Sequence, residues 1–291
     1  MSDLNHLDSP VIGVDLGGTK VLAGRIENGQ VLSSHRELVP KGDNEMEVVQ
    51  AIMKSIERVL HDDITAIGIG VPSVVDPVKG IVYDVQNIPS WKEVHLKEIL
   101  QDRYNLPVYL NNDANCFALG ERYFGFGKEY DSFVGLIVGT GIAAGVIVNG
   151  RLYNGHNCGA GEFGVMPYLD ECFEYYSCGQ FFENVYGLKG ALVYENAMKG
   201  DPDAISKFEE MGSHLGHCIK VVLYALDPQL IVLGGSVSSA YPIFKEAMWQ
   251  SIRTIAYRKI PERLKIEVSA NPDLPVLGAA ALCYEASMLS L

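Results

Sequence analysis

Two glycine turns, each between two short apolar segments, constrain the fold of this chain more than any other feature. Gly17-Gly18-Thr19 lies between the apolar segments 11–15 and 21–26. Gly139-Thr140-Gly141, further along the chain, also lies between two apolar segments. Apolar runs joined by a tight glycine turn are typical of β-hairpins. Each hairpin is followed by helical patterns and further strands. This repetition predicts an α/β fold of two similar lobes, with mixed sheets covered by helices and a cleft between the lobes.

Apolar residues at helical or strand spacing predict the remaining elements. The expected helices are 44–60, 96–104, 203–226, 241–257 and a last one from 276, and the expected strands are 64–71, 107–110, 229–233 and 264–268. Residues 153–177 are expected to be irregular. The predicted lobes are 1–112, joined by the last helix 276–291, and 113–275.

One stretch, 132–150, carries no charged residue and is nearly long enough to span a membrane. It contains five glycines, including the central Gly139-Thr140-Gly141. Turn residues at the middle of an apolar run indicate two buried strands rather than one helix. We therefore expect a hairpin here and no membrane contact.

The charge balance limits the classes of partner. The chain has 23 Lys and Arg against 36 Asp and Glu, a formal net charge of −13, with 48% hydrophobic residues. Nucleic-acid binding begins with basic side chains that neutralise phosphates, so a nucleic-acid partner is not expected. A small anionic ligand needs only a local pocket and stays possible.

The six cysteines are scattered, and they are too few for a disulfide framework in a chain of 291 residues. This predicts a reduced, cytoplasmic setting. The N-terminal segment 1–10 is polar and lacks the apolar core of a signal peptide, so no targeting segment is expected.

The first glycine turn has the residues of a phosphate site. Gly17 and Gly18 let the backbone approach a ligand, and successive N–H groups of such a turn form an anion-binding concavity. Thr19 adds a hydroxyl donor and Lys20 a positive charge. Asp15, at the end of the preceding strand, has the chemistry to hold a hydrated Mg²⁺. A plain hairpin turn remains the alternative for this segment.

Two further turns repeat the pattern. Gly139-Thr140-Gly141 joins two strands, and no helix follows as a dinucleotide-binding fold would need. Gly234-Gly235 follows the strand 229–233. A simple turn is the alternative for each one alone. Three glycine turns at strand ends favour one polyanionic ligand.

Acidic and amide side chains complete the candidate site. Asn112 and Asp113 follow an apolar strand, where a carboxylate in a cleft can act as a general base toward a hydroxyl. The alternative for Asp113 is a helix N-cap. Glu162, in a glycine-rich segment, and Glu183 suit hydrogen bonding to sugar hydroxyls. Ordinary surface carboxylates are the alternative for both.

Taken together, these segments resemble the ROK family of sugar kinases, which belongs to the actin and hexokinase (ribonuclease H-like) superfamily. The resemblance extends in the family's order from residue 11 to the last helix. The matching segments are Asp15–Lys20, Gly68–Pro72, Asp76, Gly80, Asn87, Trp91, Asn112-Asp113, Gly139–Gly141 and Leu233–Gly235. It implies ATP and Mg²⁺ at the glycine turns. It also implies that Asn87, Asn112, Glu162 and Glu183 contact a sugar and that Asp113 deprotonates its hydroxyl.

The sequence departs from the family where the family binds a structural zinc. Val165 replaces the family's histidine, and only Cys172 and Cys178 remain of its cysteine run. His156 and Cys158 are the other side chains that could complete a four-ligand site. The Cys-x-x-Cys spacing typical of such sites is missing, so we expect no zinc.

The resemblance thus implies an ATP-dependent kinase of a hexose or related sugar, and a homodimer. Only residues 1–10 precede the first predicted strand, too few for the helix-turn-helix of the family's repressors. Two alternatives stay open. One is a sugar-binding regulatory protein without kinase activity, because the histidine and cysteines are missing. The other is an ATPase or carboxylate kinase of the same superfamily, against which the Asn112-Asp113 pair argues.

Overall fold

The computed structural model describes residues 9–289, which form two compact units. The first unit contains the described residues up to Lys128, the segment Leu152–Ala160 and the residues from Asn271 onward. The second contains Glu129–Arg151 and Gly161–Ala270. This division puts 113–128, 152–160 and 271–275 in the first unit, where the predicted boundaries put them in the second lobe. The prediction that 1–10 contains no targeting segment concerns mostly residues 1–8, which lie outside the described part of the chain.

The first unit is built on a five-stranded sheet with the order β3-β2-β1-β4-β8. Strands β1, β2 and β3 are antiparallel neighbours, and β1, β4 and β8 run parallel. The strands are β1 (Val11–Leu16), β2 (Lys20–Glu27), β3 (Gln30–Leu38), β4 (Ile67–Val71) and β8 (Val108–Asn112).

The second unit repeats this arrangement with the order β11-β10-β9-β14-β15. Strands β9 and β10 form the predicted hairpin, and β9, β14 and β15 run parallel. The strands are β9 (Phe133–Val138), β10 (Ile142–Val148), β11 (Arg151–Leu152), β14 (Leu230–Gly234) and β15 (Lys265–Val268). The prediction of one α/β unit used twice is therefore confirmed.

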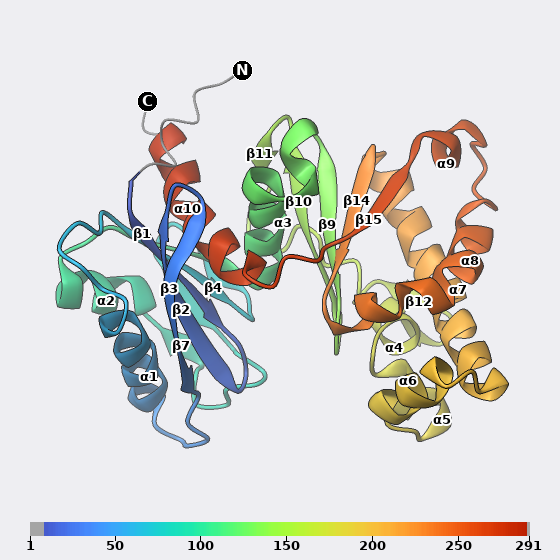
Figure 1. Cartoon of the computed structure of the whole chain (residues 1–291), viewed down its shortest axis with the longest axis horizontal. Coiled ribbons are helices and arrows are strands. Elements are labelled where there is room, and N and C mark those ends of the chain that lie inside the picture. Colours follow the sequence, from blue (N-terminus) through green and yellow to red (C-terminus); the bar gives the residue numbers. More distant parts are fainter. Residues whose placement is uncertain (1–8, 290–291) are drawn as a thin grey trace. The chain divides into compact units, whose positions relative to one another are not determined.

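Helices cover both faces of the first sheet (Figure 1). Helices α1 and α2 share a core with the inward residues of β1 and β4. Helices α3 and α10 pack on the opposite face. In the second unit, α7 and α8 pack against each other and share a core with β9 and β14. The main helices are α1 (Glu45–Glu57), α2 (Leu96–Tyr104), α3 (Asp113–Phe124), α7 (Pro202–Leu226), α8 (Tyr241–Ile252) and α10 (Leu274–Leu289).

Shorter elements complete both units. The first unit has a small three-stranded sheet, β5 (Val75–Asp76), β6 (Ile81–Tyr83) and β7 (Glu93–Val94). The second has β12 (Pro167–Tyr168), β13 (Glu171–Cys172), α4 (Phe173–Ser177), α5 (Phe181–Tyr186), α6 (Gly190–Met198), α9 (Lys259–Arg263) and a 3-10 helix, Ser236–Ala240. The segment 153–177, expected to be irregular, thus contains β12, β13 and α4. Helix α8 ends at Ile252, before the predicted end at 257.

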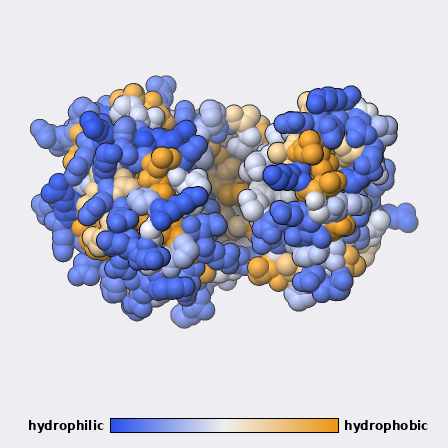
Figure 2. All heavy atoms as spheres, turned by 90° about the horizontal axis from the view of Figure 1, so that it is seen from below, coloured by the Kyte–Doolittle hydropathy of each residue, from blue (hydrophilic) through white to orange (hydrophobic). Residues whose placement is uncertain are grey.

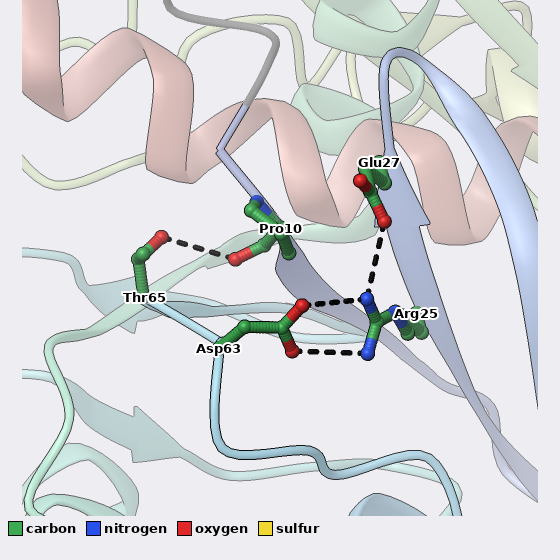
Figure 3. A network of polar contacts seen from close by, with 5 residues as sticks. All are labelled: Pro10, Arg25, Glu27, Asp63 and Thr65. Carbon is green, nitrogen blue, oxygen red and sulfur yellow. Dashed lines mark hydrogen bonds and ion pairs between the residues drawn. The ribbon is translucent and has the colours of Figure 1, made fainter.

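A polar network fixes the end of the first sheet where β1 and β4 begin (Figure 3). The Arg25 guanidinium donates to both carboxylate oxygens of Asp63, at 3.0 and 2.7 Å, and to Glu27 at 3.1 Å. The Thr65 hydroxyl donates to the Pro10 carbonyl at 3.0 Å. These contacts tie β2 and the residue before β1 to the loop that leads into β4, at the opposite end of the strands from Asp15.

Helix α10 lies unusually close to β1. A Cβ built on Gly13 would lie 2.1 Å from the Val276 carbonyl oxygen, which is backbone and has little freedom to move. We therefore expect Gly13→Ala to lower the free energy of unfolding by about 3 kcal/mol, the upper range for overpacking. Urea titration measures the change. Gly159→Ala is the control, because a Cβ there meets nothing within 4 Å. Equal stabilities of the two variants would contradict this packing.

No helix within residues 9–289 is long and apolar enough to cross a membrane. Figure 2 shows mostly hydrophilic side chains on the visible face of each unit, with small apolar groups among them. Exposed large apolar residues of the second unit include Val165 (61% exposed), Leu169, Leu192 and Met198.

Candidate active site

The candidate residues fall into two groups, one in each unit. In the first unit, the parallel strands β1, β4 and β8 bring Asp15, Gly70 and Asn111 into register at their carboxyl ends. A Cβ built on Gly70 would lie 3.1 Å from the Cys116 Sγ and 3.8 Å from the Asp113 Cα, so the start of helix α3 lies close to Gly70. Asp15 pairs with Gly70 across the sheet, and Asp113 follows β8, the other neighbour of β4. The backbones of Asp15 and Asp113 therefore both lie next to Gly70.

The start of helix α3 holds Asn112 and Asp113. Asn112 is the N-cap, and its side-chain oxygen accepts the Ala114 N–H at 2.8 Å. Its amide nitrogen donates to the Ser73 carbonyl at 3.2 Å. One Asp113 oxygen also accepts the Ala114 N–H, at 2.8 Å. Asn112, rather than Asp113, is thus the cap, and the helix N-terminus favours a negative charge at Asp113.

Burial gives Asp15 unusual electrostatics. Desolvation raises the pKa of Asp15 from 3.8 to about 6. Among the described residues, no cation and no hydrogen-bond donor contacts its carboxylate and opposes this effect. A half-buried carboxylate without compensation fits a site for a bound cation, since an added positive charge would offset the cost of ionisation.

The first glycine turn closes through a hydrogen bond from the Gly17 N–H to the Lys20 carbonyl, 2.9 Å long. A Cβ on Gly18 would lie 2.7 Å from the Asn87 Cβ, so Asn87 packs directly on the turn. Thr19 and Lys20 are exposed. The turn, Asn87 and Asp15 are therefore neighbours within one unit, although Asn87 is far from the turn in the sequence.

A buried amide network lies behind Asn112 and was not anticipated from the sequence. The Asn111 side-chain oxygen accepts hydrogen bonds from the Asn115 amide at 2.8 Å and from the Cys158 thiol at 3.2 Å. The Asn111 amide donates to the Asn154 side chain at 3.0 Å. Four polar residues within one apolar-flanked segment, 111–115, were the only sequence signal. The network anchors 152–160 to the strand that carries Asn112.

In the second unit, two of the glycine turns line one cavity of about 410 Å³. Gly139 and Thr140 form one part of its wall, and the residues directly after Gly234-Gly235 form another. Gly235 has φ = +85°, and a Cβ there would lie 2.4 Å from the Val138 carbonyl oxygen, so only glycine lets the two turns meet. The cavity residues are Gly139, Thr140, Gly179, Gln180, Phe182, Glu183, Gly190, Ala191, Tyr194, Phe208, Ser236, Val237, Ser239 and Ala240.

The two candidate glutamates lie in different surroundings. Glu183, on α5, lines this cavity together with the glycine turns, which favours contact with the ligand of that cavity. Glu162 is outside the cavity lining. Partial burial, and secondarily the Glu174 carboxylate, raise the pKa of Glu162.

The alternative zinc ligands do not fit a metal site. The Cys158 thiol donates to Asn111, and the Cys178 thiol lies 2.7 Å from the Thr140 carbonyl oxygen and 2.9 Å from that of Glu174. Burial raises the pKa of Cys178 to about 12, whereas zinc binds the thiolate. Within residues 9–289, no three His, Cys, Asp or Glu side chains are grouped so that they could hold a metal. The described residues therefore do not bring His156, Cys158, Cys172 and Cys178 together as a four-ligand group.

Comparison with known proteins finds relatives over most of the chain. The chain is similar to a glucokinase of Streptomyces coelicolor, with 31% identity over 263 residues that cover 78% of this chain and 82% of that protein. It is also similar to the xylose repressor of Bacillus subtilis, with 25% identity over 94% of this chain and 77% of the repressor.

A solved structure, a ROK family glucokinase from Streptomyces griseus in complex with glucose and AMPPNP, matches with a TM-score of 0.80 and 27% identity. The match covers 94% of this chain and 98% of that one. The expected actin/hexokinase-like fold is thereby confirmed. A model of the ROK family matches residues 11–286, nearly the whole chain. The chain therefore belongs to the ROK family.

Proposed function

We propose that this chain is an ATP-dependent kinase that phosphorylates a hydroxyl group of a hexose or related sugar. Among its relatives are glucokinases, and one solved relative holds glucose and AMPPNP. The observation that carries the proposal is that Asp15 and Asp113 both lie next to Gly70 at the carboxyl ends of parallel strands. This is the edge at which α/β sheets bind ligands.

Asp113 is the proposed general base. It accepts the proton of the attacking sugar hydroxyl, while Asn112 and Asn87 orient the sugar through their amides. A base within hydrogen-bond reach of the reacting hydroxyl accelerates such a transfer by about 10²–10⁴-fold. The N-cap bonds of Asn112 and the buried Asn111 network fix the backbone from which Asp113 projects.

The cavity of the second unit is the proposed nucleotide site. Backbone N–H groups of the glycine turns bind phosphate oxygens, as in other anion-binding concavities. Glu183 lines the same cavity, so we assign it to the nucleotide rather than to the sugar. Glu162 remains a proposed sugar contact. Lys20 and Thr19, in the first glycine turn, are proposed to contact phosphate oxygens.

Asp15 is the residue that would hold Mg²⁺, through water. When bound, the ion neutralises charge on the transferring phosphoryl group, since this chemistry depends on positioning and electrostatics. Asp15 suits this task because its carboxylate is half-buried and uncompensated.

A screen for sugar-dependent ADP release tests the proposal. The protein is incubated with ATP and Mg²⁺ and with glucose, mannose, fructose, allose, N-acetylglucosamine, N-acetylmannosamine or a β-glucoside. At least one sugar should raise ADP release well above the rate without sugar. The same rate with and without every sugar would contradict a sugar kinase and favour the ATPase alternative.

A sugar-binding regulatory protein is the second candidate. Two observations favour it: similarity to a xylose repressor over 94% of the chain, and an exposed Val165 in place of the family histidine. This candidate predicts that a sugar raises the melting temperature without releasing ADP. Sugar-dependent ADP release would exclude it.

A further inference from the structure

A segment that follows β13 holds the second glycine turn, Gly139-Thr140-Gly141, by three successive contacts. We define the α4 clamp as Glu174, Cys178 and Gly179. The Gly179 N–H donates to the Gly139 carbonyl at 2.8 Å. The single proton of the Cys178 thiol is shared between the Thr140 carbonyl at 2.7 Å and the Glu174 carbonyl of its own segment at 2.9 Å. A Glu174 carboxylate oxygen accepts the N–H of Ile142, the residue after the turn, at 2.8 Å.

These contacts determine which way the turn faces. In a trans peptide the carbonyl and the N–H point in opposite directions, and the described residues contain no cis peptide. Because the carbonyls of Gly139 and Thr140 point at the clamp, the N–H groups of Thr140 and Gly141 point away from it. The carbonyls of Gly139 and Thr140 are thus kept on the clamp side of the turn, and the N–H groups of Thr140 and Gly141 on the other side. By the same rule the Gly141 carbonyl points away from Glu174, and it is engaged by the Gly139 N–H at 3.0 Å. An anion approaching from that side meets the two N–H donors of Thr140 and Gly141.

The clamp fits the turn closely. A Cβ built on Gly141 would lie 2.3 Å from a Glu174 carboxylate oxygen, so the absence of a side chain at Gly141 lets the carboxylate reach the Ile142 N–H. Cys178 is fully buried, and Gly179 lines the cavity together with Gly139 and Thr140. Gly179 is therefore the clamp residue in the wall of the proposed nucleotide site, whereas Glu174 and Cys178 are outside its lining and contact the turn.

We propose that the α4 clamp presets this turn for the phosphates of the nucleotide through hydrogen bonds of the chain itself, without a metal. The inference rests on the proposed nucleotide site. Glu174 and Cys178 are positioning residues, since they act through the turn and not on the ligand. The segment that carries zinc ligands in the family pattern is held here by a thiol, a carboxylate and a backbone N–H.

The test measures the Kd for ADP by calorimetry in the full-length protein. Cys178→Ala removes one of the three bonds and should weaken ADP binding about five- to tenfold, the effect of one lost hydrogen bond. Cys178→Ser retains a donor and should restore most of the affinity. Glu174→Ala, at a partly exposed site, should weaken binding similarly, and Glu174→Gln, which keeps an acceptor oxygen, should restore it.

Two controls separate positioning from a general loss of structure. Cys218→Ala removes another fully buried thiol of the same unit, in the core of α7, and should leave the Kd for ADP unchanged. Glu171→Ala removes an exposed carboxylate of the neighbouring β13 and should also leave it unchanged. Treatment of the wild type with a zinc chelator in excess Mg²⁺ should not alter ADP binding.

The outcomes are distinct. Wild-type ADP affinity in both Cys178→Ala and Glu174→Ala overturns the clamp while leaving the proposed function intact. The clamp is also overturned if Cys178→Ser weakens ADP binding as much as Cys178→Ala does. Loss of ADP binding on treatment with the chelator overturns it as well. If the wild type binds no ADP, the proposed nucleotide site fails, and this inference with it.

Discussion

Asp113→Asn is expected to lower sugar-kinase turnover by about 10²–10⁴-fold, because it removes the proposed base and keeps the size of the side chain. KM for the sugar should change little, since Asn112 and the other proposed sugar contacts remain. Asp113→Ala should have the same effect on turnover. Steady-state kinetics with the sugar found in the ADP screen measure both values.

Folding is not expected to account for this loss. Asn112 supplies the N-cap of α3, so the loss of the helix N-terminal charge in Asp113→Asn costs about 0.3–1 kcal/mol. Glu45→Gln is the matched control, because it removes an exposed carboxylate from the first turn of α1 in the same unit. It should retain full turnover. Near wild-type turnover in Asp113→Asn would remove Asp113 from the mechanism.

Asp15→Asn is expected to have opposite effects on activity and stability. Activity should fall at least about 10²-fold, because an amide holds Mg²⁺ less strongly and the ion stabilises charge in the transition state. The free energy of unfolding at pH 7.5 should rise by about 2–3 kcal/mol, because the folded protein no longer has to ionise a desolvated carboxylate. Kinetics and urea titration measure the two effects.

The pH dependence of that stability gain follows from the raised pKa of Asp15. Between pH 3.8 and about 6 the folded state of the wild type holds a proton that the unfolded state has released. The contribution of Asp15 to the wild-type free energy of unfolding is therefore fully present below pH 3.8. It is lost as the pH rises through about 6. The difference in the free energy of unfolding between Asp15→Asn and the wild type should be near zero below pH 3.8 and constant well above pH 6.

Asp76→Asn is the control, because the pKa of Asp76 is shifted in the direction opposite to that of Asp15. Backbone N–H groups of Lys79 and Val78 donate to the Asp76 carboxylate and lower its pKa, so this substitution should bring no gain in stability. A gain for Asp76→Asn as large as that for Asp15→Asn, or no gain for Asp15→Asn, would contradict the assigned environment of Asp15.

The sequence was informative where structure depends on neighbouring residues. Apolar runs around Gly17-Gly18 and Gly139–Gly141 predicted both hairpins, and their repetition predicted two similar sheets. The predicted helix 44–60 corresponds to α1, where Asn44 is the N-cap and its side chain accepts the Met46 N–H at 3.0 Å. These features depend on residues a few positions apart, which a single sequence displays.

Features that depend on distant contacts were missed. Strand β3 is exposed on both faces over much of its length, so it lacks the alternation that marks a strand. Helices α4 and α5 have five and six residues, too few for a helical period to be visible. The packing of Asn87 on Gly18 and the α4 clamp join residues that only the fold brings together. The residue types at these positions indicated polar contacts. The spacing of the residues along the sequence did not predict which residues they contact.

Mass spectrometry of the sugars after incubation with ATP and Mg²⁺ tests the proposed kinase activity most directly. At least one hexose or related sugar should gain one phosphoryl group, ADP should form in equal amount, and Asp113→Asn should lose this product. No phosphorylated sugar from any member of the panel, or undiminished product with Asp113→Asn, would contradict it.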